Sequence, residues 1–207
     1  MIPLLKKYKK QVAFTLAEIL ITLLIIGVVA SLVIPNLMHD TQNAELKVAW
    51  KKAYGTIEQT VRLAQKDDPT IFSGYNCYDG SGRNIYNALK NTMGYIKECN
   101  SNVLGNCWAD NGVTPDTAVA PGCPWFKSYR QNDSSAFIAK DGTFWLVYSE
   151  DSINVCPIIA VDVNGKKGPN QWNKDVLSVG VYNNKITLGG EYGVCVNNPN
   201  AKNYLTN

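Results

Sequence analysis

The most unusual ionisable residue in this 207-residue chain is Glu18, which stands at the head of an apolar run. From Ile19 to Met38 no side chain is charged, and Ile, Leu and Val dominate. A carboxylate in such a segment is costly, at about 2.5 to 3.5 kcal/mol for a charge at the centre of a membrane helix. Two interpretations follow: Glu18 is one half of an ion pair, or it lies fully hydrated among lipid headgroups.

Six cysteines form a second candidate group, and all of them follow the apolar run. They are Cys77, Cys99, Cys107, Cys123, Cys156 and Cys195. None forms a Cys-x-x-Cys pair or a Cys/His cluster of the zinc-binding type, so disulfides in an oxidising compartment are the simpler interpretation. The alternative is a set of buried free thiols in a cytosolic protein. Spacing alone leaves the pairing of these disulfide candidates open.

An oxygen-rich segment is the third candidate. It reads Asp162-Val163-Asn164-Gly165-Lys166-Lys167-Gly168-Pro169-Asn170, and Asp175 follows shortly after. Alternating carboxylate and amide oxygens around a bend suit Ca²⁺, which makes Asp162, Asn164 and Asp175 candidate ligands. The loop is not an EF-hand, because its glycine comes too early and no bidentate glutamate closes it. The alternative is a turn in which Asp162 and Asn164 bond backbone amides.

Enzymatic motifs are missing from the sequence. His39 is the only histidine, and no serine or cysteine near it belongs to a nucleophile motif, so neither a triad nor a histidine metal site is supported. There is no glycine-rich phosphate loop and no dinucleotide-binding fingerprint. We therefore predict no catalytic residues, no enzyme activity and no cofactor other than the candidate Ca²⁺.

The charge distribution predicts how the apolar run is oriented. Four lysines, Lys6, Lys7, Lys9 and Lys10, precede it, and they account for more than the whole formal charge of +3. A helix over Ile19 to Met38 could cross roughly 30 Å of hydrocarbon. Basic residues on its N-terminal side place the N-terminus in the cytoplasm and the remainder outside. Nothing after residue 13 looks built for phosphate backbones, so no direct nucleic-acid binding is expected.

The sequence after this run predicts two helices followed by strands. An apolar face continues at helical spacing and predicts a helix that ends near Asp67-Asp68-Pro69. The residues of that face are Leu46, Trp50, Ala53, Ile57, Val61 and Ala64. Trp50 and Tyr54 are expected to be packing residues and not a binding surface. A second helix is predicted over Asn84 to Lys97, with Ile85, Leu89, Met93 and Ile96 on one face.

The C-terminal part predicts an antiparallel sheet of four or five strands packed on the amphipathic part of the first helix. The strands expected are Ala136 to Lys140, Phe144 to Ser149, Pro157 to Val163, Val176 to Tyr182 and Lys185 to Leu188, with a hairpin turn at Asp141-Gly142. The loops between residues 70 and 134 hold four of the six cysteines, so disulfides would supply order there.

The residues Ala13-Phe14-Thr15-Leu16-Ala17-Glu18 after a short basic leader resemble the prepilin peptidase motif of type IV pilins and type II secretion pseudopilins. The resemblance implies cleavage between Ala13 and Phe14 and N-methylation of Phe14. It also implies that Glu18 pairs with the Phe14 amine of a neighbouring subunit. The alternatives are an uncleaved signal anchor and removal of a conventional signal peptide.

Gly27 and Pro35 match positions where many pilins carry a helix-weakening glycine and a proline. Glycine lowers helix stability by about 1 kcal/mol relative to alanine, and proline removes an amide donor, so the two bracket a stretch able to extend. The oxygen-rich segment also resembles a loop found in many pseudopilin-like heads, some of which hold calcium there.

The fold expected is therefore α+β and pilin-like: a long N-terminal helix with an apolar stem half and an amphipathic head half, packed on a C-terminal antiparallel sheet with disulfide-rich loops. Residues 1–13 would be a removed leader, 14–38 a transmembrane and filament-core helix, 39–68 the amphipathic half, and 69–207 an extracytoplasmic head.

The function expected is that of a structural subunit, a pilin or pseudopilin. It would lie in the bacterial inner membrane before assembly and in a periplasmic or cell-surface filament afterwards. The resemblance implies other copies of the chain, a prepilin peptidase, an assembly platform and an ATPase as partners. The alternative is a membrane-tethered recognition module that does not polymerise.

Overall fold

The computed structural model describes residues 14–72, 81–100, 103–108, 135–148, 158–182, 184–188 and 199–206. The chain divides into two compact units, with the boundary between Asn43 and Ala44. We call the second unit the head. The predicted leader with Ala13 lies outside the described residues, and so do four of the disulfide candidates: Cys77, Cys123, Cys156 and Cys195.

Helix α1 spans Leu16–Asp67 and continues through Pro35. Its end agrees with the sequence prediction. The amide of Asp68 still donates to the Ala64 carbonyl at 3.0 Å, whereas the Asp68 carboxylate accepts from the Thr70 amide at 2.8 Å and starts a turn. Pro69 has no amide hydrogen to extend the helix.

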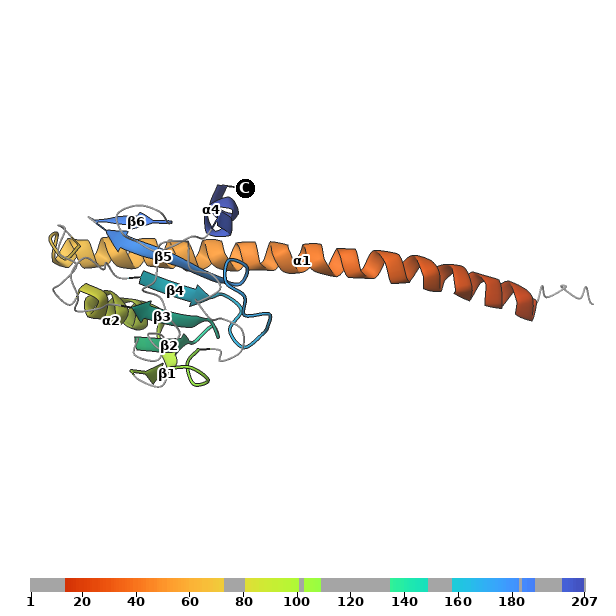
Figure 1. Ribbon diagram of the computed structural model, residues 1–207, viewed down its shortest axis with the longest axis horizontal. Coiled ribbons are helices and arrows are strands. Elements are labelled where there is room, and N and C mark those ends of the chain that lie inside the picture. The colour runs from red at the N-terminus through yellow and green to blue at the C-terminus, as the bar shows by residue number, and fades with distance from the viewer. Residues whose placement is uncertain are drawn as a thin grey trace, which may run out of the picture. The chain divides into compact units, whose positions relative to one another are not determined.

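The head contains one antiparallel sheet whose strands follow each other in sequence order (Figure 1). Its strands are β1 (Tyr95–Cys99), β2 (Ser135–Ala139), β3 (Phe144–Tyr148), β4 (Ile158–Asp162), β5 (Val176–Tyr182) and β6 (Lys185–Thr187). Strands β2 to β6 confirm the predicted strands to within a few residues. The sheet has six strands where four or five were expected, because β1 was not predicted.

Two helices complete the described part of the head. Helix α2 spans Ser81–Met93, so the predicted extension to Lys97 is wrong. Gly94 adopts a φ of 63°, a left-handed conformation that ends a helix, and the chain then enters β1. Ile96 consequently lies in a strand and is 67% exposed, instead of lying on the apolar face of the helix. The C-terminal helix α4 (Pro199–Thr206) was not predicted.

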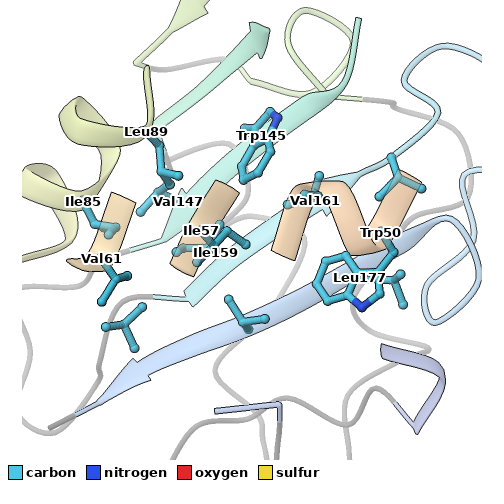
Figure 2. Close-up of a cluster of buried hydrophobic side chains, with 14 of the residues drawn as sticks. Trp50, Ile57, Val61, Ile85, Leu89, Trp145, Val147, Ile159, Val161 and Leu177 are labelled. Atoms are coloured by element: carbon cyan, nitrogen blue, oxygen red, sulfur yellow. The ribbon is translucent and has the colours of Figure 1, made fainter. Parts of the chain in front are cut away.

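The main core lies between α1, α2 and one face of the sheet. Figure 2 shows α1 side chains facing strand residues, with α2 beside them. Trp50 and Ile57 of α1 are fully buried, as predicted. The labelled members of this cluster are Trp50, Ile57, Val61, Ile85, Leu89, Trp145, Val147, Ile159, Val161 and Leu177. Burial of this apolar area is the main favourable contribution to the folding of the head.

The opposite face of the sheet carries a second, smaller core. Side chains alternate between faces along a strand, so Ala136, Leu146 and Ala160 point away from the main cluster. They pack with Val103 and Trp108 of the segment after β1. A disulfide between Cys99 and Cys107 ties that segment to the strand, which confirms a disulfide in the head.

Candidate functional site

Glu18 is held by the start of its own helix. Its Oε2 atom accepts hydrogen bonds from the backbone amide of Thr15 at 2.8 Å and from the Thr15 hydroxyl at 2.9 Å. The Thr15 Oγ1 accepts in return from the Glu18 amide at 3.2 Å. This reciprocal arrangement is a capping box, in which Thr15 is the N-cap and Glu18 the third helical residue.

The cap gives Glu18 a second role that the sequence interpretation missed. The pattern Thr-x-x-Glu before an apolar helix is visible in the sequence and is the signature of a capping box. Thr15 is thus a further candidate site residue. The cap keeps the Glu18 carboxylate at the positive end of the helix dipole, and the N-cap Thr15 directly follows Phe14 in the chain.

The apolar side chains in the N-terminal part of α1 are not buried by any described residue of their own unit. The large apolar side chains from Phe14 to Met38 are exposed, from 44% for Ile19 to 80% for Leu16. At Gly27, an added Cβ would meet no atom within 4 Å. Within the described residues, α1 is the one helix long and apolar enough to cross a membrane. A helix that is apolar on all sides requires lipid or other helices around it.

The structure brings the three predicted cation ligands together in the loop between β4 and β5. Asp175 organises this loop through both carboxylate oxygens. Oδ1 accepts from the Gln171 amide at 2.6 Å, and Oδ2 accepts from the Asn170 amide at 2.8 Å. The Asn164 side-chain amide also donates to Oδ2, at 3.2 Å. The loop is therefore built around an inward-pointing carboxylate.

Asp162 lies at the end of β4, and both it and Asp175 are fully buried. Its Oδ1 accepts from the Asn164 amide at 3.3 Å, as the turn interpretation expects. Burial and the neighbouring negative charge of Asp175 raise the pKa of Asp162 to about 8. Two carboxylates with such an environment favour either a shared proton or a bound cation.

The Oδ1 atom of Asn164 indicates which ligand the oxygen atoms of Asp162, Asn164 and Asp175 can bind. It is buried and accepts no hydrogen bond from any residue that the structure describes. A buried acceptor left unpaired is unfavourable, by about 1 to 3 kcal/mol. An oxygen donor beside two carboxylates fits a hard cation such as Ca²⁺. Among the described residues no group of three or more His, Cys, Asp or Glu side chains is placed to hold a metal ion, so such a site would depend on this amide and on backbone oxygens.

Comparison with proteins of known function gives two relatives. The chain is 40% identical over 105 residues to the type II secretion system core protein G of Vibrio cholerae, across 49% of this chain and 71% of that protein. It is 52% identical over 101 residues to the protein of the same name from Escherichia coli, across 47% of this chain and 69% of that protein. No protein-family model matches the chain, and no solved structure matches it significantly.

These matches cover more than two thirds of each relative. They cover only about half of this chain, so they identify a family more firmly than a particular role. The chain belongs to the family of type IV pilins and type II secretion pseudopilins, which are structural proteins and not enzymes, and its apolar N-terminal helix indicates a membrane-anchored protein of the cell envelope.

Proposed function

We propose that this chain is the subunit of a type IV pilus-like or type II secretion filament. One observation carries the proposal: the part of α1 between Phe14 and Met38 is apolar on every side and exposed along its length. In the inner membrane lipid would cover it, and in a filament other copies of the same helix would. The N-terminus would lie in the cytoplasm before assembly.

Processing would prepare the subunit for assembly. Cleavage between Ala13 and Phe14 removes residues 1–13 and leaves a methylated Phe14 amine. Residues 14–38 then form the filament core, residues 39–68 form the amphipathic half of the helix, and residues 69–207 form the globular extracytoplasmic part that faces the periplasm or the cell surface. A prepilin peptidase, an assembly platform and an ATPase are the partners that this role requires.

Glu18 would act in assembly through its charge. We expect its carboxylate to pair with the Phe14 amine of the neighbouring subunit while the capping box with Thr15 fixes its position. Glu18→Gln separates the two roles, because glutamine also completes a capping box but carries no charge. Both Glu18→Gln and Glu18→Ala should insert into the membrane and form no filaments, measured by electron microscopy and a filament-shearing assay.

Thr15→Ala is the matched control, since it removes the N-cap side chain and keeps the Glu18 charge. It should assemble, with a less ordered first turn, because losing an N-cap destabilises a helix end by about 1 kcal/mol. Normal filaments from Glu18→Gln would contradict the ion pair and leave only the cap as the role of this residue.

The rival function is a membrane-tethered recognition module that does not polymerise. The disulfide-tied segment between Cys99 and Cys107 is the part of the head that such a module could present. Mass spectrometry of the native N-terminus distinguishes the two functions. A methylated Phe14 supports the filament subunit, whereas an intact Met1 supports the tether.

We further propose that Asp162, Asn164 and Asp175 hold a divalent cation, with Ca²⁺ as the best fit to their oxygen donors. The full chain in detergent, freed of metal with a chelator, should gain thermal stability on addition of Ca²⁺. Asp162→Asn should abolish that gain while the protein still folds. An unchanged Tm of the wild-type protein would leave the loop as a turn organised by Asp175.

A further inference from the structure

Five lysines gather at the end of the head where α1 enters it. We call them the basic collar: Lys47, Lys166, Lys167, Lys174 and Lys202. Lys166, Lys167 and Lys202 are exposed, and the other two are half-buried. They come from three separate parts of the chain, so only the fold reveals that they form one group.

Specific contacts bring these parts together. The Trp50 indole of α1 donates to the Ala201 carbonyl of α4 at 3.0 Å, which fixes α4 against the first turns of α1 in the head. Asn200 donates to Asn173 through its backbone amide at 2.9 Å and its side-chain amide at 2.6 Å, which fixes α4 to the β4–β5 loop. Figure 1 shows that loop and α4 at the same end of the sheet.

The loop is also held from its other side. Gly165 has a φ of 62°, and an added Cβ there would collide with the carbonyl oxygen of Gly142 in the β2–β3 turn. Lys166 and Lys167 directly follow this contact. Together with the Asp175 hydrogen bonds, it gives the loop lysines a defined place on the head.

Charge is segregated at this end of the head. The two acidic residues of the loop, Asp162 and Asp175, are fully buried, whereas Lys166 and Lys167 are exposed and Lys174 is half-buried. Lys52 is neutralised by Asp141 at 2.7 Å, but no collar lysine forms an ion pair with any described residue. Glu45 is the exposed acid of the first α1 turn in the head. Counted over the described residues, the collar therefore keeps a net positive charge.

Chain connectivity ties the collar to the membrane. Lys47 follows Met38, the last residue of the apolar run, by nine positions. Nine residues span about 14 Å as a helix and at most about 32 Å fully extended. A surface tethered so closely experiences a high effective concentration of lipid headgroups. We propose that the basic collar docks the head on anionic phospholipid headgroups at the outer surface of the membrane before the subunit is assembled.

The strength of this contact follows from general membrane electrostatics. Each lysine near an anionic surface raises the binding constant about fivefold, and the attraction decays within a Debye length of about 10 Å at moderate salt. Docking therefore holds the head close to the membrane without adding a second permanent anchor. It concerns the unassembled subunit and is independent of whether the chain goes on to form filaments.

The test compares lipid compositions with the full chain in nanodiscs. Discs of phosphatidylcholine alone and discs that also contain phosphatidylglycerol are treated with an amine-reactive reagent, and labelling of each lysine is read by mass spectrometry. We expect labelling of the collar to fall several-fold in the anionic discs and to recover at high salt. Lys66 and Lys185, at the opposite end of the head, serve as internal controls and should be labelled equally in both.

Two triple variants complete the design. Lys166→Gln with Lys167→Gln and Lys202→Gln should restore labelling of Lys47 and Lys174 in anionic discs. The control, Arg62→Gln with Lys66→Gln and Lys185→Gln, removes the same charge elsewhere and should leave collar protection intact. Thermal melts establish that both variants fold.

Equal collar labelling in the two kinds of disc would overturn the proposal. Protection that grows with protein concentration and does not depend on phosphatidylglycerol would also overturn it, because the collar would then face a second copy of the chain.

Discussion

The unit boundary after Asn43 divides α1 into two parts that bury their apolar side chains to opposite extents. We call residues 16–43 the stem half and residues 44–67 the head half. In the stem half Ile25 and Ile26 are 57% and 63% exposed. In the head half Trp50 and Ile57 are completely buried against the sheet and α2. Apolar side chains of the head half are therefore buried by other parts of the chain. Those of the stem half require lipid or another protein to cover them.

This difference separates two kinds of stability. The head half is stabilised by contacts inside the chain, so its unfolding free energy is a property of the isolated subunit. The stem half has no such contacts in its unit, and lipid or other copies must supply them. A substitution in the head half should change folding, whereas an equivalent substitution in the stem half should change insertion or assembly.

The largest effect is expected from Trp50→Ala. The substitution empties a fully buried site and removes the hydrogen bond to the Ala201 carbonyl. Loss of a buried tryptophan typically lowers the free energy of unfolding by about 3 to 5 kcal/mol, which is a large share of the stability of a small domain. Denaturant unfolding of the full chain in detergent, followed by tryptophan fluorescence, measures the loss.

Two controls turn this result into a test of the comparison. Val48→Ala, on the exposed face of the same half, should change stability by less than about 0.5 kcal/mol. Ile26→Ala in the stem half should leave unfolding of the head unchanged. A head destabilised by Ile26→Ala would show that the two halves are not energetically separate.

The next largest effect is expected at Asp175, whose buried carboxylate accepts the hydrogen bonds that organise the β4–β5 loop of the head. Asp175→Ala leaves the Asn170 and Gln171 amides without their acceptor, which should destabilise the head by about 2 to 3 kcal/mol. Asp68→Ala is the matched control, because Asp68 caps an exposed turn through Thr70. Similar losses for the two variants would show that the buried loop contributes no more than an ordinary turn.

A graded effect is expected from pH in the presence of a chelator. Asp162 ionises near pH 3.8 in the unfolded chain, but its pKa in the folded head is about 8 because of burial and the nearby Asp175. Between these values the folded state binds more protons, so stability falls as the pH rises from about 4 to about 8. Asp162→Asn should flatten the dependence of Tm on pH. A wild-type Tm that rises across this range would contradict the assignment.

The parts of the fold that the sequence predicts are those with local signals. The apolar period of α1, its stop at Pro69 and the turn at Asp141-Gly142 are all contained in short windows. Strand β1 carries no such signal, since Tyr95 and Ile96 are both exposed and its pairing with β2 is set by distant residues. Helix α4 is short, and its position depends on Trp50 and Asn173, which are far away in the sequence.

The candidate sites show the same limit. The spacing of Asp162 and Asn164 indicates an oxygen-rich turn, but only the structure shows that Asp175 organises it and that the Asn164 oxygen is left without a donor in the described chain. Thr15 is the opposite case, because its capping box with Glu18 is local and could have been predicted from the sequence.

The smallest expected effect compares one glycine from each half of α1. Gly55 in the head half and Gly27 in the stem half both have open space where a Cβ would lie. Alanine stabilises a helix interior by about 0.5 to 1 kcal/mol relative to glycine, so Gly55→Ala should raise the Tm of the head slightly. Gly27→Ala should leave that Tm unchanged, because its helix segment does not contribute to the folding of the head.

Filament assays of the same two variants then show which open space a neighbouring copy fills. If the stem half alone makes the contacts between subunits, Gly55→Ala assembles normally, and Gly27→Ala assembles poorly where helices approach closely or where the stem must extend. Loss of filaments from Gly55→Ala, in a head of normal or raised stability, would place a subunit contact on the head half and break the division between a half that folds and a half that assembles.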